Sequence, residues 1–127
     1  MPDQPPVQPR RGEIWFCRLP TDPPDNADRP VVVVSLDARN LNPRAETVLI
    51  VPLSTTLRDS PTHVQLLPGE TGLAETSHAQ AENLTTVRKA ILKGGRGPLR
   101  RLSEGKLLQL ARCVVVALGF HPQRLVG

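Results

Sequence analysis

The apolar residues of this chain fall into short β-branched runs, of which PVVVVS (30–35) is the strongest. A continuous run of this kind is typical of a strand that is buried on both faces, so it marks the centre of a sheet. Further strands are expected at EIWFCRL (13–19), TVLIVPL (47–53) and THVQLL (62–67), with a weaker candidate at SHAQAENL (77–84). The polar, turn-forming segments 21–28 and 37–46 separate them. This pattern predicts a small curled antiparallel sheet or barrel.

One segment near the C-terminus has a helical period instead. From Ser103 onward, apolar residues recur at Leu107, Leu110, Ala111, Val114 and Leu118. Ser103 can cap the start of this helix and Gly119 can close its end. The competing interpretation is a strand over CVVVAL (113–118), because successive valines disfavour helices.

Two details of the remaining segments are less regular. Pro52 near the end of its strand indicates a sheet edge or a bulge, because proline cannot donate a ladder hydrogen bond. The segment 87–99 is interpreted as one or two helical turns, which end at Gly94–Gly95 and lead into a short return strand.

The chain of 127 residues fits one domain, which we expect to span residues 11–120. A proline-rich leader (1–10) is expected to be disordered, and residues 121–127 form a C-terminal tail. Because there is no signal-peptide-like segment and no apolar run long enough to cross a membrane, we expect a cytoplasmic protein without membrane contact. The fold class is therefore mainly β with a C-terminal helix.

The charge is divided unevenly along the chain. Residues 1–86 carry 7 basic and 11 acidic side chains, whereas residues 87–127 carry 9 basic and 1 acidic. Thirteen of the sixteen cations are arginine, whose planar fork of donors suits phosphate or carboxylate. The basic last third indicates a polyanionic or acidic-peptide partner, with a solvated surface as the alternative.

Several kinds of site have no sequence support. Cys17 and Cys113 lie in separate apolar segments and are expected to be reduced core thiols, while His63, His78 and His121 are too scattered for a metal site. Asp22, Asp25 and Asp28 share a loop that we interpret as solvated rather than as a cation site. GGRG (94–97) matches no phosphate-binding loop, and no GxSxG motif occurs. No cofactor or metal is expected.

Two polar positions at strand ends remain as candidates. Arg29 stands at the start of the central strand, and Ser54, Thr55 and Thr56 follow the next one. Guanidinium and hydroxyl donors match the oxygens of a phosphate, although a surface arginine beside a capped turn would look the same.

Four ordered motifs resemble the PemK/MazF toxins: RRGEIWFCRLP (10–20), RPVVVVS (29–35), VLIVPLSTTLRDSPTHV (48–64) and ETGLAETSHAQAENLTTVRK (70–89). The resemblance implies an SH3-like small barrel that forms a homodimer and cleaves single-stranded RNA without metal. It also implies a cognate antitoxin with an acidic segment, which agrees with the basic last third.

The family's essential arginine falls on Arg29, and its essential threonine falls on Ser54, with Thr55 as the alternative hydroxyl. Two departures are visible: TDPPDNAD replaces a glycine-rich loop, and Thr85 replaces an arginine of the EQIRTV-like motif, of which Glu82 is retained. RNA contact at that motif is then expected to be weakened or moved to Arg88, with Glu82 also expected among the RNA-binding residues. The other expected RNA-binding residues lie beside or after the two strand ends: Asp28, Thr56, Arg58 and His63.

The implied reaction is attack by a ribose 2′-hydroxyl on the adjacent phosphorus, which leaves a 2′,3′-cyclic phosphate and a 5′-hydroxyl. Arg29 would stabilise the added charge and Ser54 or Thr55 would donate a hydrogen bond, while His63, Glu82 and His78 stay open as the general base. Of the aromatic residues, Trp15 and Phe16 are expected in the core. The alternative functions are a catalytically degenerate antitoxin-binding homologue and a gyrase poison of the same fold.

Overall fold

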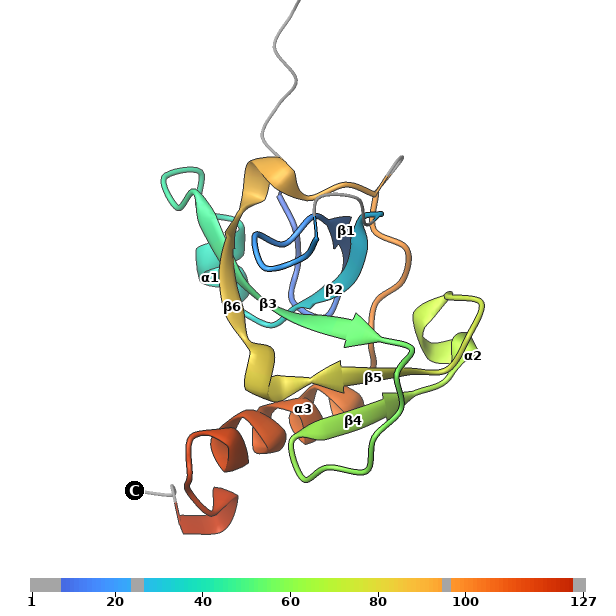
Figure 1. The fold of residues 1–127 in the computed structure, drawn as a ribbon. Helices are drawn as coiled ribbons and strands as arrows, with labels where there is room; N and C mark the ends of the chain where they lie inside the picture. Colours follow the sequence, from blue (N-terminus) through green and yellow to red (C-terminus); the bar gives the residue numbers. More distant parts are fainter. Residues whose placement is uncertain (1–7, 24–26, 95–96, 125–127) are drawn as a thin grey trace, which may run out of the picture.

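The computed structural model describes residues 8–23, 27–94 and 97–124. Six strands and one long helix form the framework of this part of the chain (Figure 1). The strands are β1 (Ile14–Cys17), β2 (Arg29–Val33), β3 (Thr47–Ser54), β4 (His63–Leu66), β5 (Ser77–Gln80) and β6 (Thr85–Arg88). The helices are α1 (Asp37–Asn40), α2 (Pro68–Thr71) and α3 (Glu104–Ala117), with 3₁₀ turns η1 (Ala81–Asn83), η2 (Lys89–Ile91) and η3 (Pro122–Arg124).

The strands form one antiparallel sheet in the order β1-β2-β3-β5-β4, and β6 also pairs with β3. The expected fold class, mainly β with a C-terminal helix, is confirmed. The sheet is not closed, however, because the end strands β1 and β4 do not pair with each other in the described ranges. Both of these end strands have four residues.

Strand β3 is the centre of the sheet rather than an edge, which corrects the interpretation of Pro52. Pro52 lies opposite Val31 of β2. Along its other side, β3 pairs with β6 through Thr47–Ile50 and with β5 through Leu53 and Ser54. Pro52 falls in the gap between these two pairings, where no N–H is needed for the ladder.

Two expected elements differ from the structure. The strand expected over 77–84 ends at Gln80, because the chain turns through η1 to bring β6 against β3. Of the helical turns expected over 87–99, the described residues of that range show η2 alone, since Val87 and Arg88 pair as strand residues with Val48 and Thr47; Gly95 lies outside the described residues.

Apolar side chains cover both faces of the sheet. One cluster, which includes Val32, Val51 and Leu66, packs against Leu107 and Leu110 of α3. The other includes Val31, Val33 and Ile50 and packs around Trp15. Strand β2 lies between β1 and β3 rather than at the centre of the sheet, but its valines are buried on both faces, as the valine run predicts.

Helix α3 has the predicted caps but a shorter buried stripe than expected. Ser103 Oγ accepts a hydrogen bond from the Lys106 N–H at 3.2 Å, and Gly119 has a φ of +88°. Leu107 and Leu110 are buried, whereas Leu118 is 67% exposed. The helix has 14 residues, about 21 Å, whereas β4 beneath it has 4, about 13 Å, so its last turns extend past the sheet. None of the helices in the described ranges has the length and apolar character that a membrane crossing requires.

Candidate functional site

The strand pairing brings Arg29 and Ser54 together. The printed pairing of β2 with β3 ends at Val31 opposite Pro52, and Arg29, the first residue of β2, and Ser54, the last residue of β3, each lie two residues beyond this last pair. Across the next pairing, Ser54 lies opposite His78 of β5. Antiparallel strands place the start of one beside the end of the other, which is why two residues 25 positions apart in the sequence meet here.

A cavity of about 640 Å³ opens at these strand ends. Four of the predicted site residues line it: Asp28, Arg29, Ser54 and Thr55. Its other walls come from the segment before β2, from β1 and from the loop between α2 and β5, and include Asp22, Phe16, Leu73 and Glu75. Phe16 was expected in the core; it is only partly buried because it lies opposite Pro30 at the cavity wall.

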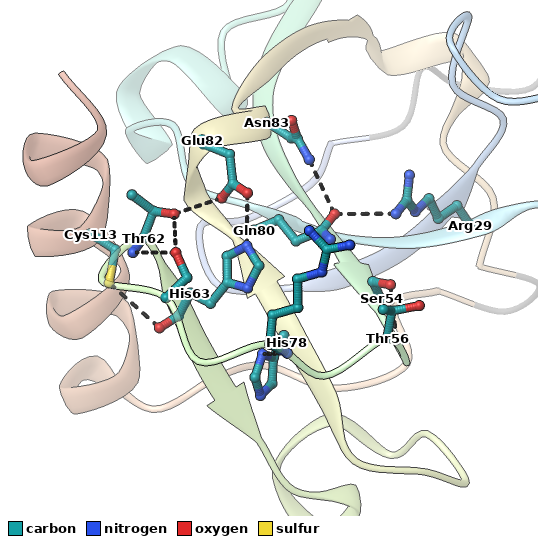
Figure 2. A network of polar contacts seen from close by, with 12 residues as sticks. Arg29, Ser54, Thr56, Thr62, His63, His78, Gln80, Glu82, Asn83 and Cys113 are labelled. Atoms are coloured by element: carbon teal, nitrogen blue, oxygen red, sulfur yellow. Dashed lines mark hydrogen bonds and ion pairs between the residues drawn. The ribbon is translucent and has the colours of Figure 1, made fainter.

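Three acceptors hold the guanidinium of Arg29. Its Nε donates to the backbone oxygen of Leu53 at 3.3 Å, Nη1 to Asp22 Oδ1 at 3.3 Å and Nη2 to Gln80 Oε1 at 3.2 Å. Figure 2 shows the contact with Gln80, whose Oε1 also accepts from Asn83 Nδ2. The Arg29 side chain keeps 27% of its surface exposed, so the guanidinium is fixed and still open to the cavity.

The acidic loop before β2 is not simply solvated, which corrects the expectation for Asp22. The Asp22 side chain is only 12% exposed and forms an ion pair with Arg29. Asp28 pairs instead with Lys93, 3.2 Å away, and Asp25 lies outside the described residues. Asp22 and Asp28 also help to raise the pKa of the nearby Cys17 thiol to about 11, after burial, which is the largest cause.

The hydroxyl of Ser54 is restrained although serine lacks the methyl group of threonine. Ser54 Oγ accepts a hydrogen bond from the Thr56 N–H at 3.1 Å (Figure 2). In threonine, β-branching restricts the side-chain rotamer; in Ser54 this hydrogen bond has the same effect. The bond uses the oxygen as an acceptor, so the hydroxyl proton is still free to donate. Thr55 and Thr56 are exposed beside it.

A second polar group lies next to Gln80. Glu82 accepts hydrogen bonds from Thr62 Oγ1 at 3.0 Å and from His63 Nε2 at 2.7 Å. Burial alone would raise the pKa of the Glu82 carboxyl, but the bonds from His63, its own backbone and Thr62 outweigh burial and hold that pKa below its ordinary value. Glu82 is therefore ionised near neutral pH, and His63 Nε2 must carry the proton that it donates.

The imidazole rings of His63 and His78 meet edge to face, with centroids 5.6 Å apart. The His63 side chain is 5% exposed, and its buried Nδ1 has no hydrogen-bond partner within the described part of the chain. His78 Nδ1 accepts the backbone N–H of Arg58 at 3.2 Å, which ties the loop after β3 to β5.

Arg88 is the one predicted site residue that the structure places far from the others. It ends β6 opposite Thr47, at the start of β3, whereas Ser54 ends that strand. It pairs with Glu46 at 3.6 Å across an exposed surface. Seven residue steps along a strand span about 23 Å, so Arg88 does not reach the cavity.

Several basic side chains of the last third form ion pairs within the protein, which the sequence does not indicate. Its cations Arg88, Lys93 and Lys106 pair with acidic residues of the first part of the chain. The two cysteines are free thiols as expected, and burial raises the pKa of the Cys113 thiol. The described ranges contain no cluster of three metal-ligating side chains.

The sequence did not indicate Gln80 or Asn83 as site residues, and it indicated that Asp22 lies in a solvated loop. The signal for Gln80 is strand alternation, because it follows His78 by two positions and so lies on the same side of β5. Its contact with Arg29 joins residues 51 positions apart, and only the β3–β5 pairing makes it visible.

A comparison with protein families matches residues 10–118 to the PemK-like, MazF-like toxins of type II toxin–antitoxin systems. One curated relative, the probable endoribonuclease MazF5 of Mycobacterium tuberculosis (strain ATCC 25618 / H37Rv), is 31% identical over 110 residues, which cover 87% of this chain and 93% of that protein.

Solved structures from mycobacterial species are similar as well. An endoribonuclease in complex with its cognate antitoxin superposes with a TM-score of 0.72 at 28% identity, covering 88% of this chain and 96% of that one. A second endoribonuclease gives a TM-score of 0.71 at 27% identity, covering 91% of this chain and 95% of that one.

Proposed function

This chain belongs to the family of PemK-like, MazF-like toxins of type II toxin–antitoxin systems, and from that membership we propose that it is an endoribonuclease that cleaves single-stranded RNA without metal. The observation that carries the proposal is the meeting of Arg29 with the hydroxyls of Ser54 and Thr55 at one cavity. The similar mycobacterial proteins named as endoribonucleases support the same class of reaction.

In the proposed reaction the nucleophile belongs to the substrate. The ribose 2′-oxygen loses its proton and attacks the adjacent phosphorus, the bond from phosphorus to the 5′-oxygen breaks, and that oxygen takes up a proton. The products are a 2′,3′-cyclic phosphate and a 5′-hydroxyl. The protein has to align the ribose and stabilise the extra negative charge on the pentacoordinate phosphorus.

Arg29 is suited to that stabilisation. A guanidinium has five N–H donors, and three of those of Arg29 are engaged with Leu53, Asp22 and Gln80. The two other N–H groups, one on each Nη, have no partner among the described residues and can bind two oxygens of one phosphate. The hydroxyl of Ser54, with its oxygen held by the Thr56 N–H, can donate to a further oxygen.

No residue is assigned as the general base. His63 and Glu82 are bonded to each other, and His78 Nδ1 accepts a backbone N–H. We propose that Asp28 in the cavity wall and Thr56 and Arg58 beside the cavity border the RNA path. His63 and Glu82 shape this path from β4 and η1.

We further propose that the protein forms a homodimer and is neutralised by a cognate acidic antitoxin. One similar mycobacterial endoribonuclease was solved in complex with its cognate antitoxin, which supports this partner. The basic side chains of the last third, several of them exposed, suit an acidic peptide. Cleavage of messenger RNA would stop translation and growth until the antitoxin binds.

The test is incubation of the purified protein with a long single-stranded RNA in EDTA, followed by mapping of the new ends. We expect cyclic phosphate ends, and a rate that falls about 10²–10³-fold in Arg29→Ala with the fold intact. Arg112→Ala, which removes an exposed arginine of α3, is the matched control and should cleave at the wild-type rate. Uncut RNA would favour a catalytically degenerate antitoxin-binding homologue, and trapping of gyrase on DNA would favour a gyrase poison.

A further inference from the structure

We infer that Gln80 is a positioning residue: its side-chain oxygen fixes the plane in which Arg29 presents its free N–H groups to the scissile phosphate. This inference rests on the proposed function and adds to it a residue that does not touch the substrate. The basis is the 3.2 Å hydrogen bond from Arg29 Nη2 to Gln80 Oε1.

The orientation of the Gln80 amide is set from its other side. Asn83 Nδ2 donates to the same Gln80 Oε1 at 3.2 Å (Figure 2). Two donors converge on one atom, so that atom must be the oxygen, and the amide nitrogen of Gln80 points elsewhere. Arg29 therefore meets an acceptor whose direction does not depend on Arg29 itself.

The backbone that carries Gln80 is fixed as well. Gln80 ends β5 opposite His63 of β4. The turn η1 that follows is held by Glu82, which bonds to His63 and to Thr62. The hydrogen bond between His63 and Glu82 therefore helps to hold the turn that places Asn83 against Gln80, and Gln80 in turn contacts Arg29.

Gln80 differs from the other acceptors in what it does to the charge of Arg29. Asp22 is a carboxylate and neutralises part of the positive charge that a phosphate would use, whereas Gln80 is neutral and orients without neutralising. Leu53 contributes only its backbone oxygen. Gln80 is therefore the side chain whose removal disturbs orientation while leaving the charge of the cavity unchanged.

The experiment measures kcat and KM for Gln80→Ala on a single-stranded RNA that the wild type cleaves. We expect kcat to fall by about 10- to 10²-fold, because small displacements of a charge-stabilising group are costly, with KM changed less than about 2-fold. Gln80→Glu restores the acceptor, so kcat should return to within about 3-fold of wild type while KM rises with the added negative charge. Gln109→Ala removes the same residue type from the exposed face of α3 and should change neither constant.

A double-mutant cycle separates positioning from a merely structural role. Lysine at position 29 has no planar fork to orient, so adding Gln80→Ala to Arg29→Lys should cost less than about 2-fold in kcat. The inference is overturned if the loss of kcat in the double variant equals the product of the losses in Arg29→Lys and Gln80→Ala. It is also overturned if Gln80→Ala alone cleaves at the wild-type kcat.

Nuclear magnetic resonance tests the same contact without RNA. The guanidinium N–H signals of Arg29 should show hindered rotation in the wild type and fast rotation in Gln80→Ala. In Asn83→Ala the rotation rate should lie between these two. If the wild type cleaves no RNA but Gln80→Ala frees the guanidinium, the positioning role stands and the proposed function fails. If the wild type cleaves RNA and the signals do not respond to Gln80, the positioning role fails alone.

Discussion

Replacing Asp22 by asparagine should make the enzyme faster at low RNA concentration. In the structure Asp22 Oδ1 lies 3.3 Å from Arg29 Nη1, and the two side chains are 12% and 27% exposed. A phosphate that binds the other N–H groups of Arg29 must come close to this carboxylate, because the phosphate and the Asp22 carboxylate then contact the same guanidinium. Asparagine keeps the oxygen acceptor that helps to hold Arg29 and removes the charge that repels the phosphate.

The size of the effect follows from the distance. Two unit charges 3.3 Å apart interact by about 5 kcal/mol at an effective dielectric constant of about 20. The phosphate would lie farther from Asp22 than Arg29 does, and solvent screens part of the repulsion between phosphate and Asp22. We therefore expect this repulsion to weaken RNA binding by about 1–2 kcal/mol. Since 1.4 kcal/mol corresponds to a factor of ten, we expect kcat/KM to rise about 5- to 30-fold, mainly through a lower KM.

The assay is steady-state cleavage of a short fluorescent RNA at several salt concentrations. The gain in Asp22→Asn should shrink as salt rises, because screening weakens the repulsion in the wild type. Glu104→Gln removes one negative charge from the start of α3 and should show no comparable gain. A fall in kcat/KM for Asp22→Asn would refute the reasoning, because it would mean that the charge of Asp22 is needed to keep Arg29 in place.

The other predictions concern stability. Leu110 is 1% exposed in the cluster under α3, so Leu110→Ala should lower the free energy of unfolding in urea by about 2–5 kcal/mol, whereas Leu108→Ala, at a position that is 53% exposed, should cost less than about 1 kcal/mol. The pKa of Glu82 is lower in the folded protein than its ordinary value of 4.5, so its stabilising contribution is complete above that pH and is lost as the pH falls through the folded pKa. Urea titrations from pH 7 to pH 3 should therefore show a steeper loss for the wild type than for Glu82→Gln, and parallel curves would contradict this linkage.

Much of the fold follows from local sequence patterns. The valine run of β2 predicts a strand buried on both faces, and Ser103 with Gly119 predicts both ends of α3. The length of the buried stripe on α3 was not predictable, because it depends on how far β4 extends beneath the helix. Closure of the sheet depends in the same way on strand lengths and on which strands share β3.

The candidate site was predictable where neighbouring strands place it. Arg29 and Ser54 stand at strand ends that antiparallel pairing brings together. Asp22 and Gln80 were not predictable, because one lies in an irregular loop and the other reaches Arg29 only through the pairing of β5 with β3. Arg88 looked suitable by charge and motif, but the register of β6 sets it at the far end of β3.

The most direct measurement is a structure of the protein bound to an RNA oligonucleotide whose scissile ribose lacks the 2′-hydroxyl and so cannot be cleaved. The scissile phosphate should lie in the cavity within about 2.7–2.9 Å of the Nη atoms of Arg29, beside the Ser54 hydroxyl. An oligonucleotide bound elsewhere, for example along Arg88 and Glu46, with Arg29 still held by Asp22 and away from any phosphate, would contradict the account.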